Sequence, residues 1–405
     1  MNRLLIVGNG FDIAHNLKTK YRDYIKYYWQ KVKDSTYKDD NIEFIFSTIN
    51  LNNCKSLNDV TNYLAQYYKG VTIETNGTIT KSNGELVMSF HNKFFFRINQ
   101  RYDEANWVDI EMEYYNNLKE ILKRHRELNI SESDFNTVSY SRILVLNNEI
   151  AQIAKEFESY LATEVVPISK KCFNNEVKEA FSNDGTDTHE LDRFYEEFPK
   201  GFVDKELRPY YDIKKISGEA FQKFKETYIL NFNYTNTINQ YFNTNFNSKA
   251  TIINIHGEIN DPSNKVNLGF GDERDKYYAE IEDLNKNEYL RFMKSFHYSN
   301  NKNYKKLFDF IEDSNFQIQI MGHSCGLSDR TLLNAIFEHK NCRAIKVYYH
   351  KYQQVMNDGT MDNYSEIVKN ISRHFNQKTM MRNKIIDRTL CEELSQIENV
   401  EKFAV

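Results

Sequence analysis

Near its start the 405-residue chain reads Leu4-Leu5-Ile6-Val7-Gly8-Asn9-Gly10-Phe11-Asp12, and this stretch decides the fold. Four consecutive apolar residues indicate a buried strand, because a strand covered on both faces reads as a continuous apolar run. The two glycines that follow allow the backbone to turn tightly and to approach a ligand closely. A strand, a glycine turn and an expected helix therefore predict an α/β protein whose working site lies at this turn.

Similar short apolar runs recur late in the chain and are mostly followed by Gly, Asn or His. They lie at 228–230, 251–255, 266–268, 316–321 and 344–349. Runs of this length that are rich in Ile and Val suit a parallel sheet covered on both faces. They predict a Rossmann-like, mainly parallel sheet.

The long middle of the chain has a different pattern. From about residue 21 to residue 227 apolar residues recur at helical spacing, as in 114–128 and 145–161, and the polar segments 76–83 and 182–188 are typical of loops. We therefore expect a sheet core formed by 1–25 and 226–350, a mainly helical insertion at 26–225, and a helical tail at 351–405. Within the tail, helices are expected near 365–375 and 389–397.

Composition limits the class of protein. The chain is 40% hydrophobic and 14% aromatic with a net charge of -4, which indicates a globular protein and argues against nucleic acid covering its whole surface, although a local basic groove stays open. Five scattered cysteines predict neither a disulfide framework nor a zinc site. With no leader-like start and no apolar run of roughly 18 residues, we expect a cytoplasmic protein that makes no membrane contact.

Four chemistry-bearing segments each follow a predicted strand. The carboxyl ends of parallel strands meet at one edge of a sheet, so these segments are expected to converge on one crevice. They are Gly8-Asn9-Gly10-Phe11-Asp12, Asn231-Phe232-Asn233-Tyr234-Thr235-Asn236, His256-Gly257, and Gly322-His323-Ser324-Cys325-Gly326-Leu327-Ser328-Asp329.

Asp12 complicates a simple phosphate-binding interpretation of the first segment, because a carboxylate at a helix start repels phosphate. It has two open interpretations: a cap that accepts a backbone N–H, or an acceptor for sugar hydroxyls. His15, Thr19 and Tyr21 follow it and are candidates to line the same crevice.

The second and third segments offer polar groups suited to a sugar or a water molecule. Amide side chains donate and accept at once, so Asn233 is a candidate to hold a ribose or position water, whereas Asn231 and Asn236 equally suit Asx-turns. His256 stands at a strand end beside a glycine, where a general base would be accessible.

The fourth segment also matches the G-x-S-x-G pattern of a nucleophile elbow at Gly322, Ser324 and Gly326. An esterase of that type needs its acid and base on further strands, and only about one more strand is expected downstream. We therefore rank esterase activity low.

Together these segments resemble the bacterial phage abortive-infection family AbiH. The resemblance rests on Gly8-Asn9-Gly10-Phe11-Asp12 with His15, Leu17, Thr19 and Tyr21, on Asn233-Tyr234, on His256-Gly257, and on Gly322-His323-Ser324 through Ser328-Asp329. In the insertion, Trp107-Val108-Asp109-Ile110-Glu111 also looks like a family feature.

The order of glycine turn, Asn-Tyr, His-Gly and Gly-x-Ser is also similar to that of sirtuin-like domains, which include NAD-destroying effectors of phage defence. That resemblance implies that Gly8 and Gly10 cradle a dinucleotide and that Gly322 and Ser324 contact its adenosine half. It gives catalytic roles to Asn233, which orients water or the ribose, and to His256 as base. Asp12 is a third catalytic candidate on chemical grounds rather than by resemblance, because its carboxylate can stabilise developing positive charge. The other expected nucleotide contacts are Asn9, Phe11, His15, Thr19, Tyr21, Tyr234, His323 and Asp329.

Asp12 and Thr235 depart from the sirtuin-like pattern, and a zinc-binding cysteine cluster is missing from the sequence. The Asp12 and Thr235 departures weaken the transfer of sirtuin-like roles to this chain, whereas the missing cysteine cluster favours NAD cleavage over protein deacetylation. We therefore expect an abortive-infection effector that hydrolyses NAD or a related nucleotide at the N-glycosidic bond, with no required cofactor and no metal site.

Two other functions remain open. One is a metal-dependent nuclease for RNA or DNA that uses Asp109, Glu111 and Glu113, although a solvated acidic helix face also explains these carboxylates. The other is a nucleotide-sensing module without catalysis. The expected partners are a nucleotide substrate, with a phage-derived trigger or partner protein and self-assembly left open.

Overall fold

The computed structural model describes most of the chain, namely residues 1–34, 36–45, 49–105, 109–127, 132–169, 172–181, 184–185, 188–217, 221–242, 250–352, 359 and 361–397. Trp107, which carries part of the family resemblance, lies outside these residues. None of the described helices is both long enough and apolar enough to cross a lipid bilayer.

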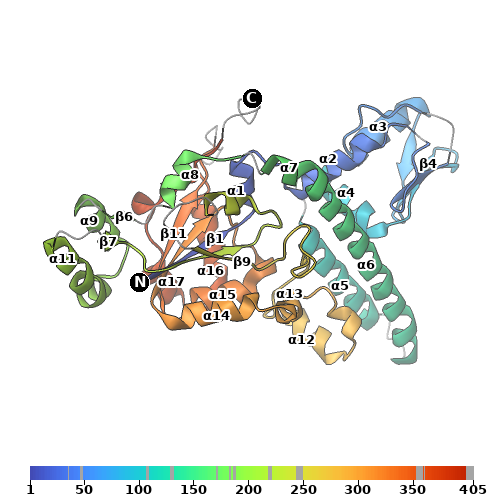
Figure 1. Cartoon of the computed structure of the whole chain (residues 1–405). Helices are drawn as coiled ribbons and strands as arrows, with labels where there is room; N and C mark the ends of the chain where they lie inside the picture. The colour runs from blue at the N-terminus through green and yellow to red at the C-terminus, as the bar shows by residue number, and fades with distance from the viewer. Residues whose placement is uncertain are drawn as a thin grey trace.

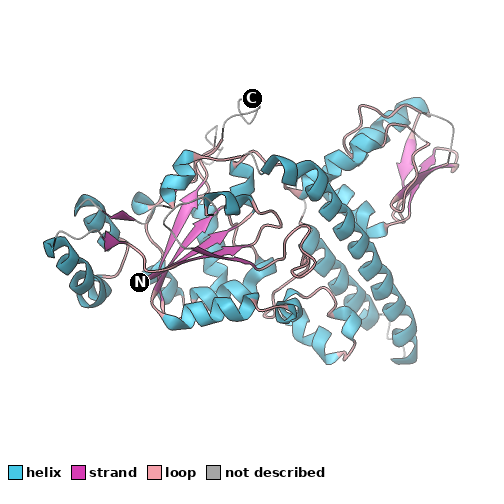
Figure 2. Ribbon diagram, viewed as in Figure 1, coloured by secondary structure: helices cyan, strands magenta, loops and turns pink. Residues whose placement is uncertain are grey.

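A six-stranded parallel sheet forms the centre of the molecule (Figures 1 and 2). Its strands are β1 (Asn2–Val7), β8 (Thr227–Asn231), β9 (Ala250–Asn254), β10 (Phe316–Met321), β11 (Cys342–Tyr349) and β12 (Glu392–Glu393). They lie in the order β9-β8-β1-β10-β11-β12, and every pairing is parallel. Numbered by appearance within this sheet the order is 3-2-1-4-5-6, the doubly wound order of Rossmann folds, so the predicted fold class is confirmed.

β1 is buried along its whole length because helices cover both faces of the sheet. Leu4 and Ile6 belong to the core on one face, and Leu5 and Val7 belong to the core on the other. This alternation follows from the two-residue period of a strand. The helices on the first face are α14 (Asn303–Asp313), α15 (Arg330–Phe337), α16 (Tyr364–His374) and α17 (Lys378–Lys384), and those on the second are α1 (Asn9–Ala14) and α8 (Asn175–Ala180).

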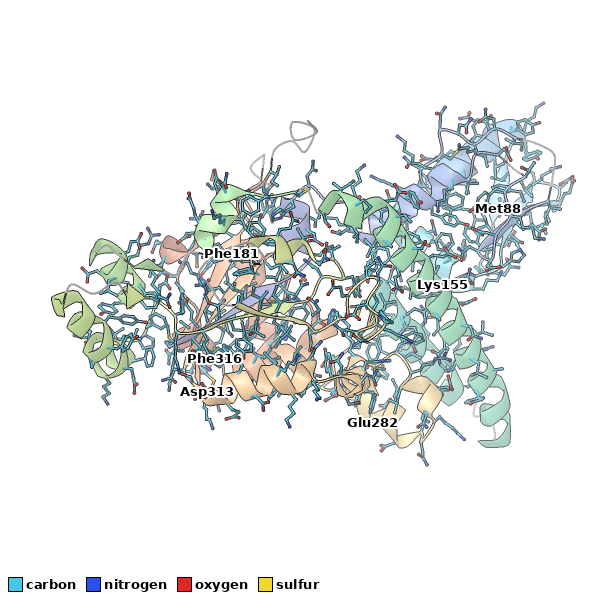
Figure 3. The ribbon with its side chains drawn as sticks, viewed as in Figure 1. Met88, Lys155, Phe181, Glu282, Asp313 and Phe316 are labelled. Atoms are coloured by element: carbon cyan, nitrogen blue, oxygen red, sulfur yellow. The ribbon has the colours of Figure 1, made fainter. Side chains whose placement is uncertain are left out.

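The chain between α1 and β8 forms lobes on either side of this sheet (Figure 1). One lobe contains α2 (Tyr21–Lys31), α3 (Leu57–Tyr67), α4 (Lys93–Ala105), α5 (Ile110–Glu127) and α6 (Glu132–Tyr160). It also holds a four-stranded antiparallel sheet of β2 (Ile42–Phe44), β3 (Val71–Ile73), β4 (Thr78–Lys81) and β5 (Leu86–Phe90). In Figure 3, Met88 of this small sheet lies well away from Phe316 of the central sheet.

The remaining elements of this region are shorter. They are the short π-helices Leu161–Val165 and Val203–Leu207, α7 (Val166–Ser169), α9 (Thr188–Glu196), α10 (Lys200–Phe202), α11 (Arg208–Ser217), and the two-residue strands β6 (Asp184–Gly185) and β7 (Phe221–Gln222). The segment between β9 and β10 contributes α12 (Lys276–Asp283) and α13 (Lys294–His297). Its apolar residues, among them Phe270 and Tyr289, join the core of the helical lobe, so this segment connects that lobe to the sheet.

Four sequence-based expectations of secondary structure are wrong. The predicted loop 182–188 contains the short strand β6. Residues 266–268 are loop rather than strand, and the predicted loop 76–83 contains β4, which forms hairpins through turns at Gly77 and Gly84. The expected helix at 389–397 is instead a short turn followed by β12, because this segment pairs with the free edge of β11. The expected helices at 114–128, 145–161 and 365–375 are confirmed by α5, α6 and α16.

The glycine turn after β1 packs directly on the turn after β10. Gly10 N–H donates to Gly322 O at 2.7 Å, and a Cβ on Gly322 would lie 2.1 Å from the backbone nitrogen of Phe11. A Cβ on Gly8 would lie 2.5 Å from the Cα of His323. Only glycine allows such close backbone contact, and β1 and β10 flank the point where the strand order reverses.

Replacing Gly322 with alanine is expected to destabilise the fold by more than about 3 kcal/mol, because it combines a φ of +73° with a backbone clash. Gly84→Ala is the matched control: its φ is +83°, but nothing lies within 4 Å of the added Cβ. The control therefore loses only about 1–2 kcal/mol. Thermal unfolding followed by circular dichroism measures both, and equal midpoints for the two variants would contradict the packing argument.

Candidate functional site

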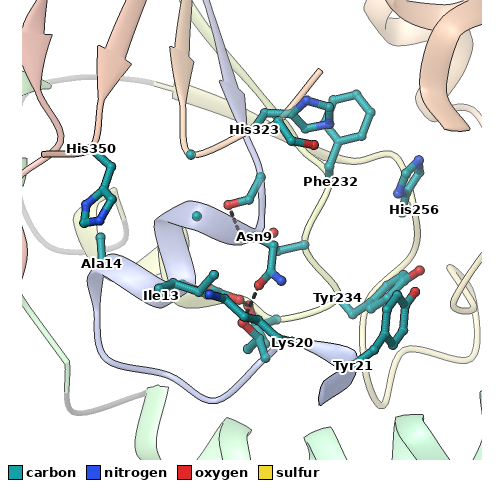
Figure 4. Close-up of a pocket in the computed structure, with 18 of the residues that line it drawn as sticks. Asn9, Ile13, Ala14, Lys20, Tyr21, Phe232, Tyr234, His256, His323 and His350 are labelled. Atoms are coloured by element: carbon teal, nitrogen blue, oxygen red, sulfur yellow. Dashed lines mark hydrogen bonds between the residues drawn. The ribbon is translucent and has the colours of Figure 1, made fainter. Parts of the chain in front are cut away.

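A cavity of about 520 Å³ opens at the carboxyl ends of the central strands. Its wall includes the turn after β1, the segments after β8, β9, β10 and β11, the start of α5, the helix α16 and the tail segment after β12. This volume falls within the range of small-molecule sites, about 300–1,000 Å³. Figure 4 shows His256 and His350 on opposite sides of α1 and its turn, so the cavity extends across the switch point of the sheet.

The structure brings together most residues that the sequence singled out. Those that line the cavity are Gly8, Asn9, Gly10, Asp12, Thr19, Tyr21, Asn233, Tyr234, His256, Gly322, His323, Ser324 and Asp329. Phe11 and His15 do not line it. Phe11 is fully buried against Phe181 and Tyr241, and His15 bonds to the Phe11 carbonyl and the Tyr241 hydroxyl beneath the turn.

The glycine turn is held in place by two side chains of the cavity wall. Asn233 Nδ2 donates to Gly8 O at 3.1 Å, and the Thr19 hydroxyl donates to Asn9 Oδ1. Tyr21 and Tyr234 lie side by side on the same wall (Figure 4). Asn231, by contrast, makes the Asx-turn that was one interpretation of it, because its Oδ1 accepts from Asn233 N at 3.1 Å.

Asp12 does not cap its helix. α1 has no side-chain cap, and Asp12 Oδ2 instead accepts a 2.6 Å hydrogen bond from the Thr235 hydroxyl. Oδ1 is buried and has no hydrogen-bond partner among the described residues. Burial raises the pKa of Asp12 to about 6, although the hydrogen bond from Thr235 opposes that rise. Oδ1 is thus a buried carboxylate oxygen without an aligned partner among the described residues, in a side chain that is only 1% exposed.

Four buried ionisable side chains form a connected group beside Asn233. Asp329 Oδ1 lies 2.9 Å from Lys294 Nζ and 3.0 Å from His256 Nε2. Lys294 Nζ also lies 2.8 Å from Glu111 Oε2. Each of the four side chains is at most 7% exposed. They come from α5, the segment after β9, the first residue of α13 and the 3-10 turn Leu327–Asp329.

Their charges follow from burial and mutual distance. Burial opposes ionisation of Asp329, but Lys294 and His256 outweigh it and hold the pKa of Asp329 well below its usual value. Burial raises the pKa of Glu111 to about 7, against the opposing attraction of Lys294. Burial lowers the pKa of His256 to about 4, and Lys294 contributes to that decrease. At neutral pH His256 is therefore a neutral imidazole beside an anionic Asp329.

The His256 and Asp329 side chains are close without being well aligned. Their 3.0 Å separation does not give a hydrogen bond of good geometry, and His256 Nε2 is a buried nitrogen with no aligned partner among the residues that the structure describes. His323 Nε2 lies 3.7 Å from the other oxygen of Asp329. Asp12 Oδ1 and His256 Nε2 are thus two buried polar atoms of cavity residues that lack an aligned partner in the described chain.

Sequence reasoning missed Lys294, the cation at the centre of this group. A single lysine in a polar segment gives no signal of its own, and only the fold brings it between Glu111 and Asp329. It also missed the far end of the cavity, which follows β11 and the tail. That end is lined by Tyr348, His350, Asn363, Glu366, Ile367, Asn370, Leu394 and Gln396.

Glu111 and Glu113 do not form a solvated acidic face, since both are less than 10% exposed. Glu111 faces Lys294 in the cavity, whereas Glu113 Oε2 lies 3.5 Å from Arg101 Nε outside it. Asp109 accepts a hydrogen bond from Met112 N near the start of α5. Within the described ranges no three acidic, histidine or cysteine side chains are grouped to hold a metal ion.

Ser324 lines the cavity, but its surroundings do not resemble a nucleophile elbow. An elbow serine stands at a sharp turn from strand directly into helix, whereas here a loop and a 3-10 turn separate Ser324 from α15. The residue with positive φ is Cys325 rather than Ser324.

The fold and the site show what class of protein this is. It is an α/β protein of Rossmann-like topology, and it has a polar cavity at the point where the strand order reverses. A family model described as bacteriophage abortive infection AbiH matches residues 4–351. Because the match covers most of the chain, the chain belongs to the AbiH family of phage abortive infection, as the sequence motifs predicted. No curated protein matches the chain.

Replacing Asp12 with asparagine is expected to stabilise the protein at high pH. A folded-state pKa of about 6 exceeds the unfolded value, so the wild type loses stability as pH rises from about 4 to about 6 and stays less stable above that. A shift of this size corresponds to about 3 kcal/mol at pH 8, and the difference between the two proteins should vanish near pH 4.

Thermal unfolding midpoints at pH 4, 6 and 8 measure this effect. Asp261→Asn serves as the control of opposite sign, because hydrogen bonds from Ser263 lower the pKa of the exposed Asp261 carboxylate. That variant should not gain stability at pH 8. A gap between Asp12→Asn and wild type that does not change with pH would show that Asp12 is not a strained buried acid.

Proposed function

We propose that the cavity binds NAD or a closely related nucleotide and hydrolyses its N-glycosidic bond, and that this reaction is how the protein acts in abortive infection. The observation that carries the proposal is the position of Asn233, His256 and Asp12 around the paired glycine turns at the switch point. In doubly wound sheets this crevice is where dinucleotides bind. The resemblance to sirtuin-like NAD-cleaving domains supports the same substrate.

The chemistry of the reaction fits these side chains. Cleavage of the bond between ribose and nicotinamide leaves positive charge on the sugar, so the site must position the ribose, direct one water molecule and exclude the rest. Asn233 supplies an amide fixed by its bond to Gly8 O. The free Oδ1 of Asp12 can accept a sugar hydroxyl and stabilise the developing cation. Both groups are therefore matched to the charge that appears in the transition state.

His256 contributes as a neutral imidazole. Its pKa of about 4, lowered by burial, means that it carries one ring proton and no charge at physiological pH. Asp329 beside Nε2 favours the tautomer with the proton on Nε2, which leaves Nδ1 as an acceptor. A ribose hydroxyl or the attacking water is a suitable donor to that atom.

The far end of the cavity has the composition expected for the second nucleoside. Tyr348, Ile367 and Leu394 offer apolar surface, and Asn363 and Gln396 offer polar groups next to it. Such a mixture of apolar and polar side chains suits a base and its sugar. His323 and Ser324 line the same cavity and follow Gly322 in the turn that packs on the turn after β1.

Asn233→Ala and His256→Ala are each expected to lower NAD turnover by about a hundredfold or more, because each removes a group that positions the reacting atoms. Release of nicotinamide is measured with the purified protein and in cells that carry it after phage infection. His339→Ala is the matched control, since His339 pairs with Glu312 just before β11 begins, at the amino ends of the strands and away from the cavity.

Three outcomes would overturn the proposal in different ways. NAD turnover that is unchanged in both variants would show that the reaction takes place at another site. Magnesium-dependent degradation of RNA or DNA that is lost in Glu111→Ala would select the nuclease function. Binding of NAD without turnover, in purified protein and in infected cells, would select a sensing role.

A further inference from the structure

Glu111 is a buried carboxylate of the cavity wall that the proposed reaction has not yet used. It stands in the first turn of α5, so the insertion rather than the sheet supplies it. Its two oxygens are fixed: Oε2 by Lys294 at 2.8 Å, and Oε1 by Gly269 N–H at 3.2 Å. A side chain held in this way has a defined position relative to a ligand in the cavity.

Lys294 contacts the carboxylates of both Glu111 and Asp329, and this arrangement makes their proton affinities different. If both Glu111 and Asp329 were ionised, one lysine would leave a net negative charge in a region that excludes water. One carboxylate must then bind a proton more readily than the other. Asp329 also has His256 and His323 beside it, whereas Glu111 has only the Gly269 N–H as a second donor in the described part of the chain.

The other groups that face Glu111 do not change this conclusion. Asp109 adds negative charge near it and therefore favours its protonated form. Tyr21 and Tyr234 face it as well, but burial raises the pKa of both phenols, so they stay neutral. Glu111 is thus the carboxylate of the pair that exchanges a proton near neutral pH, and Asp329 remains the permanent anion.

We infer that Glu111 is the general base of the site and takes the proton from the water that attacks the ribose. This inference rests on the proposed function and goes further, since it gives the proton-accepting role to the insertion rather than to His256. In the step, the water oxygen bonds to C1′ while the bond from C1′ to nicotinamide breaks. The electron pair of that bond stays on the nicotinamide nitrogen, which leaves as the neutral base, and one water proton passes to Glu111 and then to solvent.

The pKa values of Glu111 and His256 agree with Glu111 as the general base. A general base works best when its pKa is near the working pH, and burial brings the pKa of Glu111 to about 7. His256, with a pKa of about 4, would hold a proton too weakly and serves instead to orient the ribose or the water. Lys294 acts as a positioning residue that keeps Glu111 and Asp329 at fixed separation.

The test compares Glu111→Gln with Glu113→Gln. Glutamine keeps the volume of Glu111 and an acceptor for Gly269 N–H, and it leaves Lys294 and Asp329 as a neutral pair, so the fold should persist. Glu113 lies on the same helix two residues later, is equally buried and faces Arg101 outside the cavity. It therefore controls for the loss of a buried carboxylate from α5.

Glu111→Gln is expected to lower kcat for NAD by about 10²–10⁴-fold while binding of ADP-ribose is retained, and Glu113→Gln should keep wild-type kcat. Wild-type kcat should rise with pH through two ionisations, that of Asp12 near pH 6 and that of Glu111 near pH 7. Only the ionisation near pH 7 should be missing from the residual activity of Glu111→Gln. In Glu111→Ala, added formate should restore part of the turnover, because a small carboxylate can occupy the vacated space and accept the proton. A purely structural role for Glu111 would not produce this rescue.

The experiments distinguish a failure of the role of Glu111 from a failure of the proposed NAD hydrolysis. Wild-type turnover with an unaffected Glu111→Gln variant, or an ionisation near pH 7 that persists in this variant, would overturn the role of Glu111 and leave NAD hydrolysis standing. Loss of that ionisation in His256→Ala, with normal turnover in Glu111→Gln, would return the base to His256. No nicotinamide release by the wild-type protein, either purified or in infected cells, would overturn both.

Discussion

The contact between the turns after β1 and β10 is the constraint on which the rest of the structure depends. Gly10 N–H bonds to Gly322 O, and neither Gly8 nor Gly322 has room for a Cβ. Because these turns meet backbone to backbone, the ends of β1 and β10 stay at a fixed separation where the strand order reverses. The segments after β8 and β9 then face this fixed point, which is why residues more than 200 positions apart, such as Gly8 and Asn233, can bond directly.

The buried ionisable group adds a second constraint, this time between the sheet and the insertion. Glu111 belongs to α5, Lys294 to the segment between β9 and β10, and Asp329 to the turn before α15. A buried ion pair is weak evidence for stability, since desolvation of the charges offsets much of their attraction. The raised pKa values of Glu111 and Asp12 likewise mark carboxylates that cost stability when ionised. Groups that are unfavourable for folding and line a cavity are more simply explained by chemistry than by structure.

Much of the central fold follows from the sequence because its signals are local. The apolar runs at 4–7 and 316–321 match β1 and β10, and glycine, asparagine or histidine after a strand marks its carboxyl end. Convergence of the four polar segments then follows from parallel topology alone. One of the wrong expectations concerns a segment decided by a distant partner: within 389–397, Glu392–Glu393 forms β12 because the edge of β11 is free. The division into sheet core, insertion and tail stays a prediction.

The site itself could be predicted only in part, for a related reason. The local sequence pattern does not determine which way a side chain points at a turn. Phe11 and His15 were therefore expected to line the crevice, although they point into the core beneath it. Glu111 was visible as an acidic residue, but whether it faced solvent or a lysine depended on how α5 packs. Lys294 gave no signal, because its importance comes entirely from two carboxylates that are 183 and 35 residues away.

The proton affinities of the cavity's carboxylates depend on the surrounding parts of the chain, because these parts keep water out. The difference in proton affinity between Glu111 and Asp329 exists because water is excluded, and it would shrink if water entered. Exclusion depends on the insertion on one side and on the tail on the other, where Ile397 N–H bonds to Ala14 O at 2.8 Å and Leu394 and Gln396 line the wall. The acid–base properties of this cavity therefore depend on how the insertion and the tail pack against the sheet, whereas its position depends on the contact between the two glycine turns.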